Sequence, residues 1–159
     1  MSLDVAEHRR IFLEKIVPEE FRGARLSARP TVVLMGGQPG SGKSGLLDAA
    51  EEYLSTPEAR AVQIVGDDLR DYHPDYQILL AADDRTAAAA TDRDSGRWVE
   101  MAIAHALEHR YSVVIEGTMR DPQVPLNTAA KFRADGYRVE AWVMAVDPLS
   151  SRLGIGNRD

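Results

Sequence analysis

The sequence has 159 residues, contains no Cys and carries a formal net charge of −6. Its length predicts one domain. The lack of Cys excludes disulfides and thiolate metal sites, and it is compatible with a cytoplasmic protein. The acidic charge argues against nucleic acid as a partner. No apolar run approaches the roughly 18 residues of a membrane span, and the charged first residues do not resemble a signal peptide.

Residues 4–22 predict a leading amphipathic helix. Apolar residues recur there at helical spacing, and Pro18 suggests a second short helical start. Residues 23–30 form a polar, basic connector. We expect residues 1–30 to be an N-terminal helical segment that packs on the rest of the domain, and the alternative is a surface for a partner.

A strand followed by a glycine-rich loop lies at residues 31–47. Residues 31–35 are β-branched or apolar and predict a buried strand. Residues 37–44 match the phosphate-binding pattern G-x-x-x-x-G-K-[ST], and an apolar helical pattern follows. The alternative is an ordinary Gly-rich turn, but the strand before and the helix after are the context that the motif requires. The sequence therefore predicts that a nucleoside triphosphate is bound by Gly37, Gln38, Pro39, Gly40, Ser41, Gly42, Lys43 and Ser44.

The composition of this loop has a physical reason. A triphosphate is a dense polyanion, and a tight loop with little side-chain bulk can direct many backbone N–H groups at it. The helix that follows offers unpaired N–H groups and a favourable dipole. Lys43 can reach the β- and γ-phosphates as a point charge. The hydroxyl of Ser44 can occupy one position on Mg²⁺, which usually keeps several waters and phosphate oxygens.

The remaining chain alternates strands and helices. We predict a helix over 44–54, a strand over 61–65, a helical region over 85–110, a strand over 112–115, a helix over 122–134 and a strand over 137–146. The region 85–110 is one helix or two divided near Ser95-Gly96, and His73-Pro74 should break any helix within 69–84. This order predicts an α/β fold with three layers, in which a parallel sheet has helices on both faces.

Two acidic residues end predicted strands beside the phosphate loop. Asp67 follows the second strand and Glu116 the third, so both should project at the edge of the sheet that holds Lys43. A carboxylate there could hold Mg²⁺ or its waters, or accept a proton from a substrate hydroxyl. The alternative is that Asp67 or Asp68 caps the next helix.

Positive charge on the γ-phosphate is also needed in phosphoryl transfer. Besides Lys43, the sequence offers four arginines that it cannot rank, although an arginine in such a position is more often a solvated surface residue: Arg70, Arg120, Arg152 and Arg158. His73 could be a ligand or a base, although a His before Pro in a polar turn more often has a structural role.

Several segments together resemble the zeta toxins of bacterial toxin–antitoxin systems, including those of the PezT type. They occur in register and span nearly the whole chain after Pro30, so that their order is more specific than any one alone. The segments are 33–44, 66–70 with His73-Pro74, Val99-Glu100, 115–120, and 145–148 through Ser151-Arg152-Leu153 to Asn157-Arg158.

The resemblance implies a P-loop kinase-like fold and a kinase that uses ATP or GTP to phosphorylate the 3′-hydroxyl of UDP-N-acetylglucosamine. It implies that Asp67 is the general base and that Lys43 and Arg158 neutralise the γ-phosphate. The positions that would line the sugar-nucleotide pocket are Glu100, Glu116, Thr118 and Arg120. It also implies an antitoxin protein as a partner, bound over the nucleotide cleft.

The family continues beyond the point at which this sequence stops, so we expect the chain to lack the family's C-terminal helical part, including a second phosphate-contacting arginine. This leaves two alternatives to a UDP-N-acetylglucosamine kinase. One is a related phosphotransferase with another hydroxylated acceptor. The other is a shortened, catalytically impaired nucleotide-binding module that engages an antitoxin-like partner.

Overall fold

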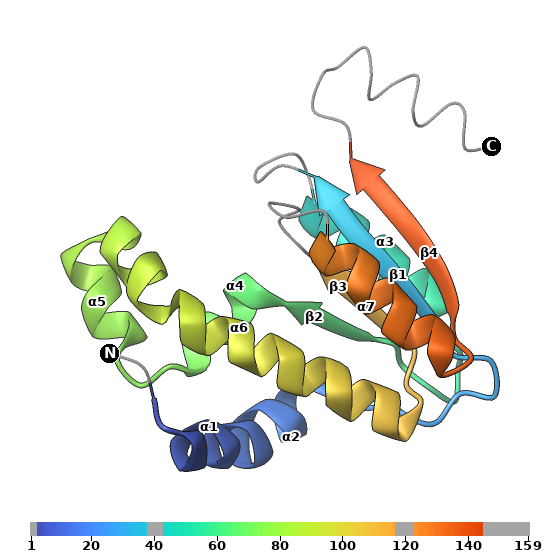
Figure 1. Ribbon diagram of the computed structural model, residues 1–159, viewed down its shortest axis with the longest axis horizontal. Coiled ribbons are helices and arrows are strands. Elements are labelled where there is room, and N and C mark those ends of the chain that lie inside the picture. The colour runs from blue at the N-terminus through green and yellow to red at the C-terminus, as the bar shows by residue number, and fades with distance from the viewer. Residues whose placement is uncertain (1–2, 38–42, 117–122, 145–159) are drawn as a thin grey trace.

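The computed structural model describes residues 3–37, 43–116 and 123–144 (Figure 1). The elements follow one another in the order α1 (Val5–Ile11), the π-helical turn η1 (Phe12–Ile16), α2 (Val17–Glu20), β1 (Thr31–Gly37), α3 (Lys43–Leu54), β2 (Val62–Val65), α4 (Gly66–Leu69), the 3₁₀ turn η2 (Arg70–Tyr72), α5 (Tyr76–Ala82), α6 (Asp84–His109), β3 (Val113–Glu116), α7 (Gln123–Ala134) and β4 (Arg138–Met144).

The four strands of the described residues form one parallel sheet in the order β2-β3-β1-β4. The chain leaves β1 toward β2 on one side and leaves β3 toward β4 on the other, so the strand order reverses between β1 and β3. Open α/β sheets bind ligands outside the carboxyl ends of their strands at such a reversal. A ligand site is therefore expected at the carboxyl ends of β1 and β3.

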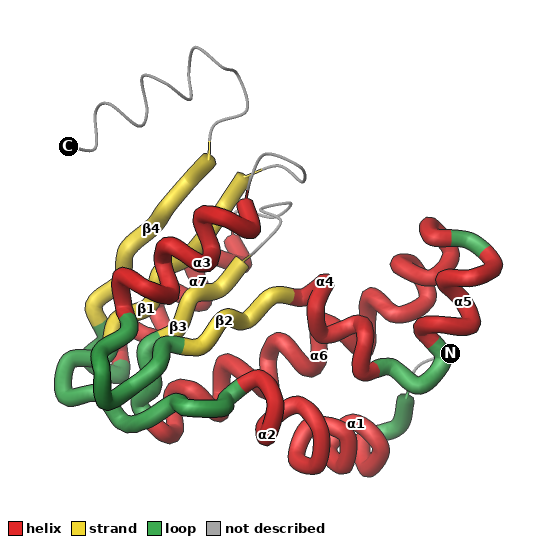
Figure 2. Tube along the Cα trace, turned by 180° about the vertical axis from the view of Figure 1, so that it is seen from behind, coloured by secondary structure: helices red, strands yellow, loops and turns green. Residues whose placement is uncertain are grey.

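Both faces of the sheet are covered, because successive strand residues point to opposite sides. Val32 belongs to a core shared with α1, η1, α6 and α7, whereas Val33 belongs to a second core beneath α3. The two views show α3 on one face and α6 and α7 on the other (Figures 1 and 2). The predicted three-layer α/β arrangement with a parallel sheet is confirmed.

Helical structure extends over residues 5–20 of the N-terminal segment, which packs mainly against α6 (Figure 1). Asp4 caps α1, since its Oδ1 accepts a hydrogen bond of 2.8 Å from the N–H of Glu7. Ile11, Phe12 and Ile16 are at most 4% exposed and share the core with Trp98 of α6. Residues 3–21 therefore complete the core on this face.

The region 85–110 is one continuous helix, so a division at Ser95-Gly96 is wrong. Gly96 is exposed, and a Cβ placed there would meet no atom within 4 Å, so no close contact requires glycine at this position. Ser95 is held instead by its Oγ, which donates to the carbonyl of Gly66 at 2.6 Å. Packing of Trp98 and Ala102 outweighs the weak local propensity of this point.

The break expected at His73-Pro74 is confirmed, because η2 ends at Tyr72 and His73 has an extended backbone. Three short elements fill this part of the chain, namely α4, η2 and α5. Across the residues that the structure describes, no helix is both long and apolar enough to cross a membrane.

Candidate functional site

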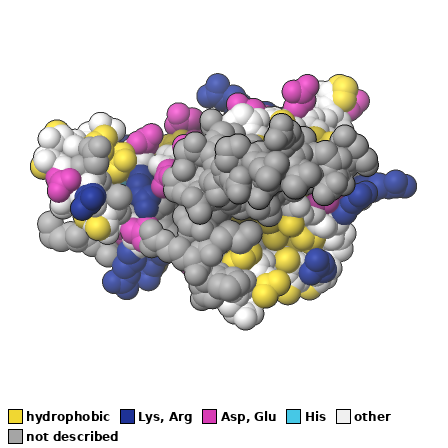
Figure 3. Space-filling view, turned by 90° about the horizontal axis from the view of Figure 1, so that it is seen from above, with side chains coloured by type: hydrophobic (Ala, Val, Ile, Leu, Met, Phe, Trp, Pro, Cys, Tyr) yellow, Lys and Arg dark blue, Asp and Glu magenta, His cyan; other side chains and the backbone are white. Residues whose placement is uncertain are grey.

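The carboxyl ends of β1, β2 and β3 meet at one edge of the sheet. Met35 and Val65 each pair in register with Glu116, the last residue of β3. Parallel pairing thus brings the end of β1 beside β3, which ends in Glu116, and places β2, which precedes Asp67, on the other side of β3. Figure 3 views the molecule from the side toward which β1 and β4 point, and acidic and basic side chains are both exposed there.

The context predicted for the phosphate loop is present. Strand β1 extends through Gly37, two residues further than predicted, and α3 begins at Lys43, one residue earlier. The backbone of Lys43 and Ser44 thus forms the first turn of a helix whose N-terminus follows the loop, which is the arrangement that favours anions. Residues 38–42 and the side chains of Lys43 and Ser44 lie outside the described part of the structure.

Asp67 does not lie on a strand, because β2 ends at Val65 and Asp67 is the second residue of α4. Nor does Asp67 or Asp68 cap this helix, since Val65 is the N-cap and makes no side-chain cap bond. The side chain of Asp67 is 84% exposed, and its Oδ1 accepts a hydrogen bond from Arg70 Nη1 at 3.0 Å. Asp67 thus presents a carboxylate to solvent just beyond the edge of the sheet.

Arg70 is not the solvated surface residue that the sequence suggested. Its side chain is only 12% exposed, and its Nη2 donates to Asp92 Oδ1 of α6 at 2.6 Å. Sequence reasoning missed this contact because Asp92 is 22 residues away in an Ala-rich helix. The spacing Asp67–Arg70 is one helical turn, so the pair itself was detectable as an i,i+3 contact.

A group of carboxylates surrounds Asp68 at the same edge. Partial burial raises the pKa of Asp68, and the negative charges of Glu20, Asp67, Asp71 and Glu116 raise it further. Glu116, at the end of β3, is half-buried. The acids that follow β2 and end β3 are therefore near enough to influence each other, as expected for neighbouring parallel strands.

Glu100 is an exposed residue of α6 and directly follows Val99. A Cβ placed on Gly66 would lie 3.7 Å from Val99 Cγ2, which shows how closely α6 approaches the start of α4. Thr118, Arg120, Arg152 and Arg158 lie outside the described residues.

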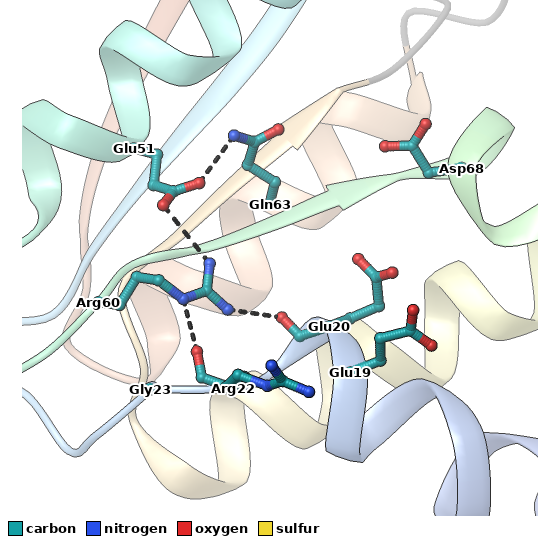
Figure 4. A pocket seen from close by; sticks show the side chains of 8 residues that line it. All are labelled: Glu19, Glu20, Arg22, Gly23, Glu51, Arg60, Gln63 and Asp68. Carbon is teal, nitrogen blue, oxygen red and sulfur yellow. Dashed lines mark hydrogen bonds and ion pairs between the residues drawn. The ribbon is translucent and has the colours of Figure 1, made fainter.

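A pocket of about 550 Å³ lies beside β2 and α2 (Figure 4). Its lining includes four carboxylates and two arginines: Glu19, Glu20, Glu51, Asp68, Arg22 and Arg60. Arg60 is committed to structural bonds, because it donates to the carbonyls of Arg22 at 2.5 Å and Glu20 at 2.8 Å. The pocket is therefore unsuited to an anion and is distinct from the predicted phosphate loop.

His73 has a structural role rather than a catalytic one. It is 4% exposed, and its Nε2 lies 2.9 Å from Asp94 Oδ2. His8 Nε2 lies 3.0 Å from the other oxygen of Asp94, close enough for an ion pair although its N–H is not aligned as a hydrogen bond. Trp98 Nε1 donates to the carbonyl of His8 at 3.2 Å. This buried polar group joins α1 to α6 and η2.

No group of three or more His, Asp or Glu residues suited to a metal ion occurs in ranges 3–37, 43–116 and 123–144.

Comparisons with known proteins agree with this arrangement. The zeta toxin family profile matches residues 19–159. Toxin zeta of Streptococcus pyogenes is 34% identical over 136 residues, which cover 86% of this chain and 46% of the relative. Toxin PezT of Streptococcus pneumoniae serotype 4 is 32% identical over 132 residues, which cover 83% of this chain and 51% of the relative. The chain thus spans about half the length of the curated relatives it matches.

A solved structure gives the same result for the fold. It comes from a molecular and structural characterisation of the PezAT chromosomal toxin–antitoxin system of Streptococcus pneumoniae, and it matches with a TM-score of 0.82 and 27% identity. The match covers 99% of this chain and 64% of that chain. The P-loop kinase-like fold class is thereby confirmed, and the sequence and structural matches together establish that this chain belongs to the zeta toxin family.

Proposed function

We propose that this chain is a nucleotide-dependent small-molecule kinase that transfers the γ-phosphate of ATP or GTP to the 3′-hydroxyl of UDP-N-acetylglucosamine. One observation carries the proposal. The exposed carboxylate of Asp67 stands at the same edge of the sheet as the β1–α3 connection, whose sequence from Gly37 to Ser44 matches the phosphate loop. A base for a hydroxyl and a cradle for a triphosphate are the two parts that a kinase of this kind requires.

In the proposed reaction, Asp67 accepts a hydrogen bond from the acceptor hydroxyl. The hydroxyl oxygen forms a bond to the γ-phosphorus, the bond from that phosphorus to the β,γ-bridging oxygen breaks, and the hydroxyl proton passes to Asp67. The loop amides and Lys43 hold the β- and γ-phosphates, and Arg158 neutralises charge that develops on the transferring group. Apart from taking this proton through Asp67, the protein contributes electrostatic stabilisation and positioning, as is usual for phosphoryl transfer.

The other assignments follow the family pattern. Glu100, Glu116, Thr118 and Arg120 would supply the acceptors and donors that hold the hydroxyls of a sugar nucleotide. Ser44 would hold Mg²⁺ through its hydroxyl, and a bound Mg²⁺ would neutralise phosphate charge. We further propose a cytoplasmic location, where ATP and GTP are supplied, and an antitoxin protein as the partner.

The test is a transfer assay with the purified chain, Mg²⁺, ATP or GTP, and UDP-N-acetylglucosamine, in which mass spectrometry detects an acceptor heavier by one phosphate. We expect Asp67→Ala to lower kcat by about 10²- to 10⁴-fold, the range typical of a lost general base, while nucleotide still binds. We expect Lys43→Ala to weaken nucleotide binding itself. Asp71→Ala is the matched control, because Asp71 is an exposed carboxylate four positions along the chain.

Three outcomes separate the candidate functions. Transfer to other hydroxylated acceptors, but not to UDP-N-acetylglucosamine, would identify a related phosphotransferase. Nucleotide binding by titration without transfer to any acceptor would identify a binding module. Unchanged turnover in Asp67→Ala would refute the assignment of the base.

A further inference from the structure

The carboxylate of Asp67 is exposed but not free. An Asp side chain that is 84% exposed would ordinarily sample several rotamers, yet Oδ1 of this residue is bonded to Arg70 Nη1 at 3.0 Å. The backbone reinforces the contact, because the N–H of Arg70 donates to the carbonyl of Asp67 in the same turn of helix. One oxygen of the carboxylate is thus engaged, while Oδ2 has no protein partner among the described residues.

Arg70 is itself fixed in place. Its side chain is only 12% exposed, and its second terminal nitrogen is bonded to Asp92 Oδ1 at 2.6 Å. A guanidinium is planar and rigid, so anchoring one nitrogen on α6 also fixes the direction of the other. An ordinary exposed i,i+3 pair has no such anchor and is worth little.

The helix that provides this anchor also holds the backbone next to Asp67. Ser95 lies one turn after Asp92 on α6, and its Oγ donates to the carbonyl of Gly66 at 2.6 Å. Gly66 immediately precedes Asp67 in α4. Contacts from a single rigid helix therefore fix both the main chain before Asp67 and the guanidinium that holds its side chain.

We propose that Arg70, anchored by Asp92, is a positioning residue that holds Oδ1 of Asp67 so that Oδ2 faces the acceptor hydroxyl. This inference rests on the proposed function, in which Asp67 is the base. It assigns separate tasks to the two oxygens of one carboxylate: Oδ1 stays bonded to Arg70 throughout, and Oδ2 takes the proton. Since Arg70 divides its charge between two carboxylates, Asp67 is oriented without being fully neutralised.

The first part of the test is kinetic. A reacting group misplaced by about 1 Å can lose roughly 10²-fold in rate, so we expect Arg70→Gln to lower kcat by about 10- to 100-fold with the KM for nucleotide unchanged within about twofold. Arg70→Lys should recover only part of the loss, because one ammonium cannot reproduce the rigid fork. Asp92→Asn should cause a smaller loss in kcat, and Arg93→Gln, an exposed neighbour on α6, should cause none.

The second part does not depend on activity. Double-mutant cycles of urea unfolding, for Asp67 with Arg70 and for Asp92 with Arg70, should each show a coupling of about two- to fivefold in the unfolding equilibrium constant. If the wild-type chain transfers no phosphate, the proposed function fails and these cycles alone decide whether the clamp exists. Absence of coupling at Asp67 would overturn the inference, as would a kcat in Arg70→Gln within about twofold of an active wild type.

Discussion

The buried carboxylate of Asp94 makes a demanding prediction about stability. Its side chain is fully buried, and its two oxygens face three nitrogens from distant parts of the chain, of which those of Leu3 and His73 make hydrogen bonds. The N–H of Leu3 lies 3.1 Å from Oδ1, His8 Nε2 lies 3.0 Å from Oδ1, and His73 Nε2 lies 2.9 Å from Oδ2. His73 Nδ1 accepts from the N–H of Asp75 at 3.1 Å, which assigns the ring proton to Nε2.

The magnitude follows from what Asp94→Ala would leave behind. Each buried donor that loses its acceptor costs about 1–3 kcal/mol, and Asp94→Ala leaves two such donors, the N–H of Leu3 and the ring N–H of His73. Truncation of a fully buried side chain also removes packing, so we expect the free energy of unfolding to fall by about 3–5 kcal/mol. For a chain of this length that corresponds to a decrease in Tm of roughly 6–20 °C.

Urea unfolding followed by tryptophan fluorescence measures this loss, since one of the two tryptophans, Trp98, is fully buried beside the network. Asp94→Asn keeps the volume of the side chain but replaces one acceptor oxygen by an NH₂ donor and removes the negative charge, so a loss shared by both variants reports the missing carboxylate rather than a cavity. Glu108→Gln is the matched control, an exposed acid on the same helix. The reasoning is refuted if Asp94→Ala unfolds within about 1 kcal/mol of the wild type.

Two further predictions concern pH. Partial burial and the carboxylates of its neighbours raise the pKa of Asp68 above the ordinary value of 3.8. Between 3.8 and the raised pKa, the folded state binds more protons than the unfolded state, so stability falls as pH rises through this range. Asp68→Asn should therefore raise the urea midpoint near neutral pH, and a lower midpoint would contradict the repulsion. Burial, helped by His109, lowers the pKa of His105 below 6.5, so stability is lost as pH falls from 6.5 toward that lowered value. His105→Gln should reduce the difference between urea midpoints at about pH 7.5 and about pH 5.5, and an undiminished difference would assign it to other groups.

The sequence was most informative where the signal is local. The strands near 31–35, 61–65 and 112–115 are short apolar runs that pair with one another in a parallel sheet. The structure places the ends of these strands within one or two residues of the prediction. The end of α7 carries a local signal of the same kind, because Gly136 follows it with a φ of +83°, a conformation that glycine adopts without strain.

Contacts between distant segments could not be predicted in this way. His8 and Asp94 are 86 positions apart by their numbers, and no periodicity connects a polar residue of α1 with one of α6. The contact between Arg70 and Asp92 also joins residues that are far apart in the sequence, so no local pattern predicts it. The choice between one helix and two at Ser95-Gly96 could likewise not be made locally, because packing of Trp98 and a bond from Ser95 to Gly66 of another element support the continuous helix.

The contact between His8 and Asp94 also bears on where a shortened protein can begin. The family match starts at residue 19, which would place the boundary after α1 and η1. A protein cut there would lose Ile11, Phe12 and Ile16, uncover the indole of Trp98, and deprive Asp94 of two of its three partners. The extent of sequence similarity is thus shorter than the unit that must fold, and truncations guided by it would remove part of the hydrophobic interior along with the N-terminus.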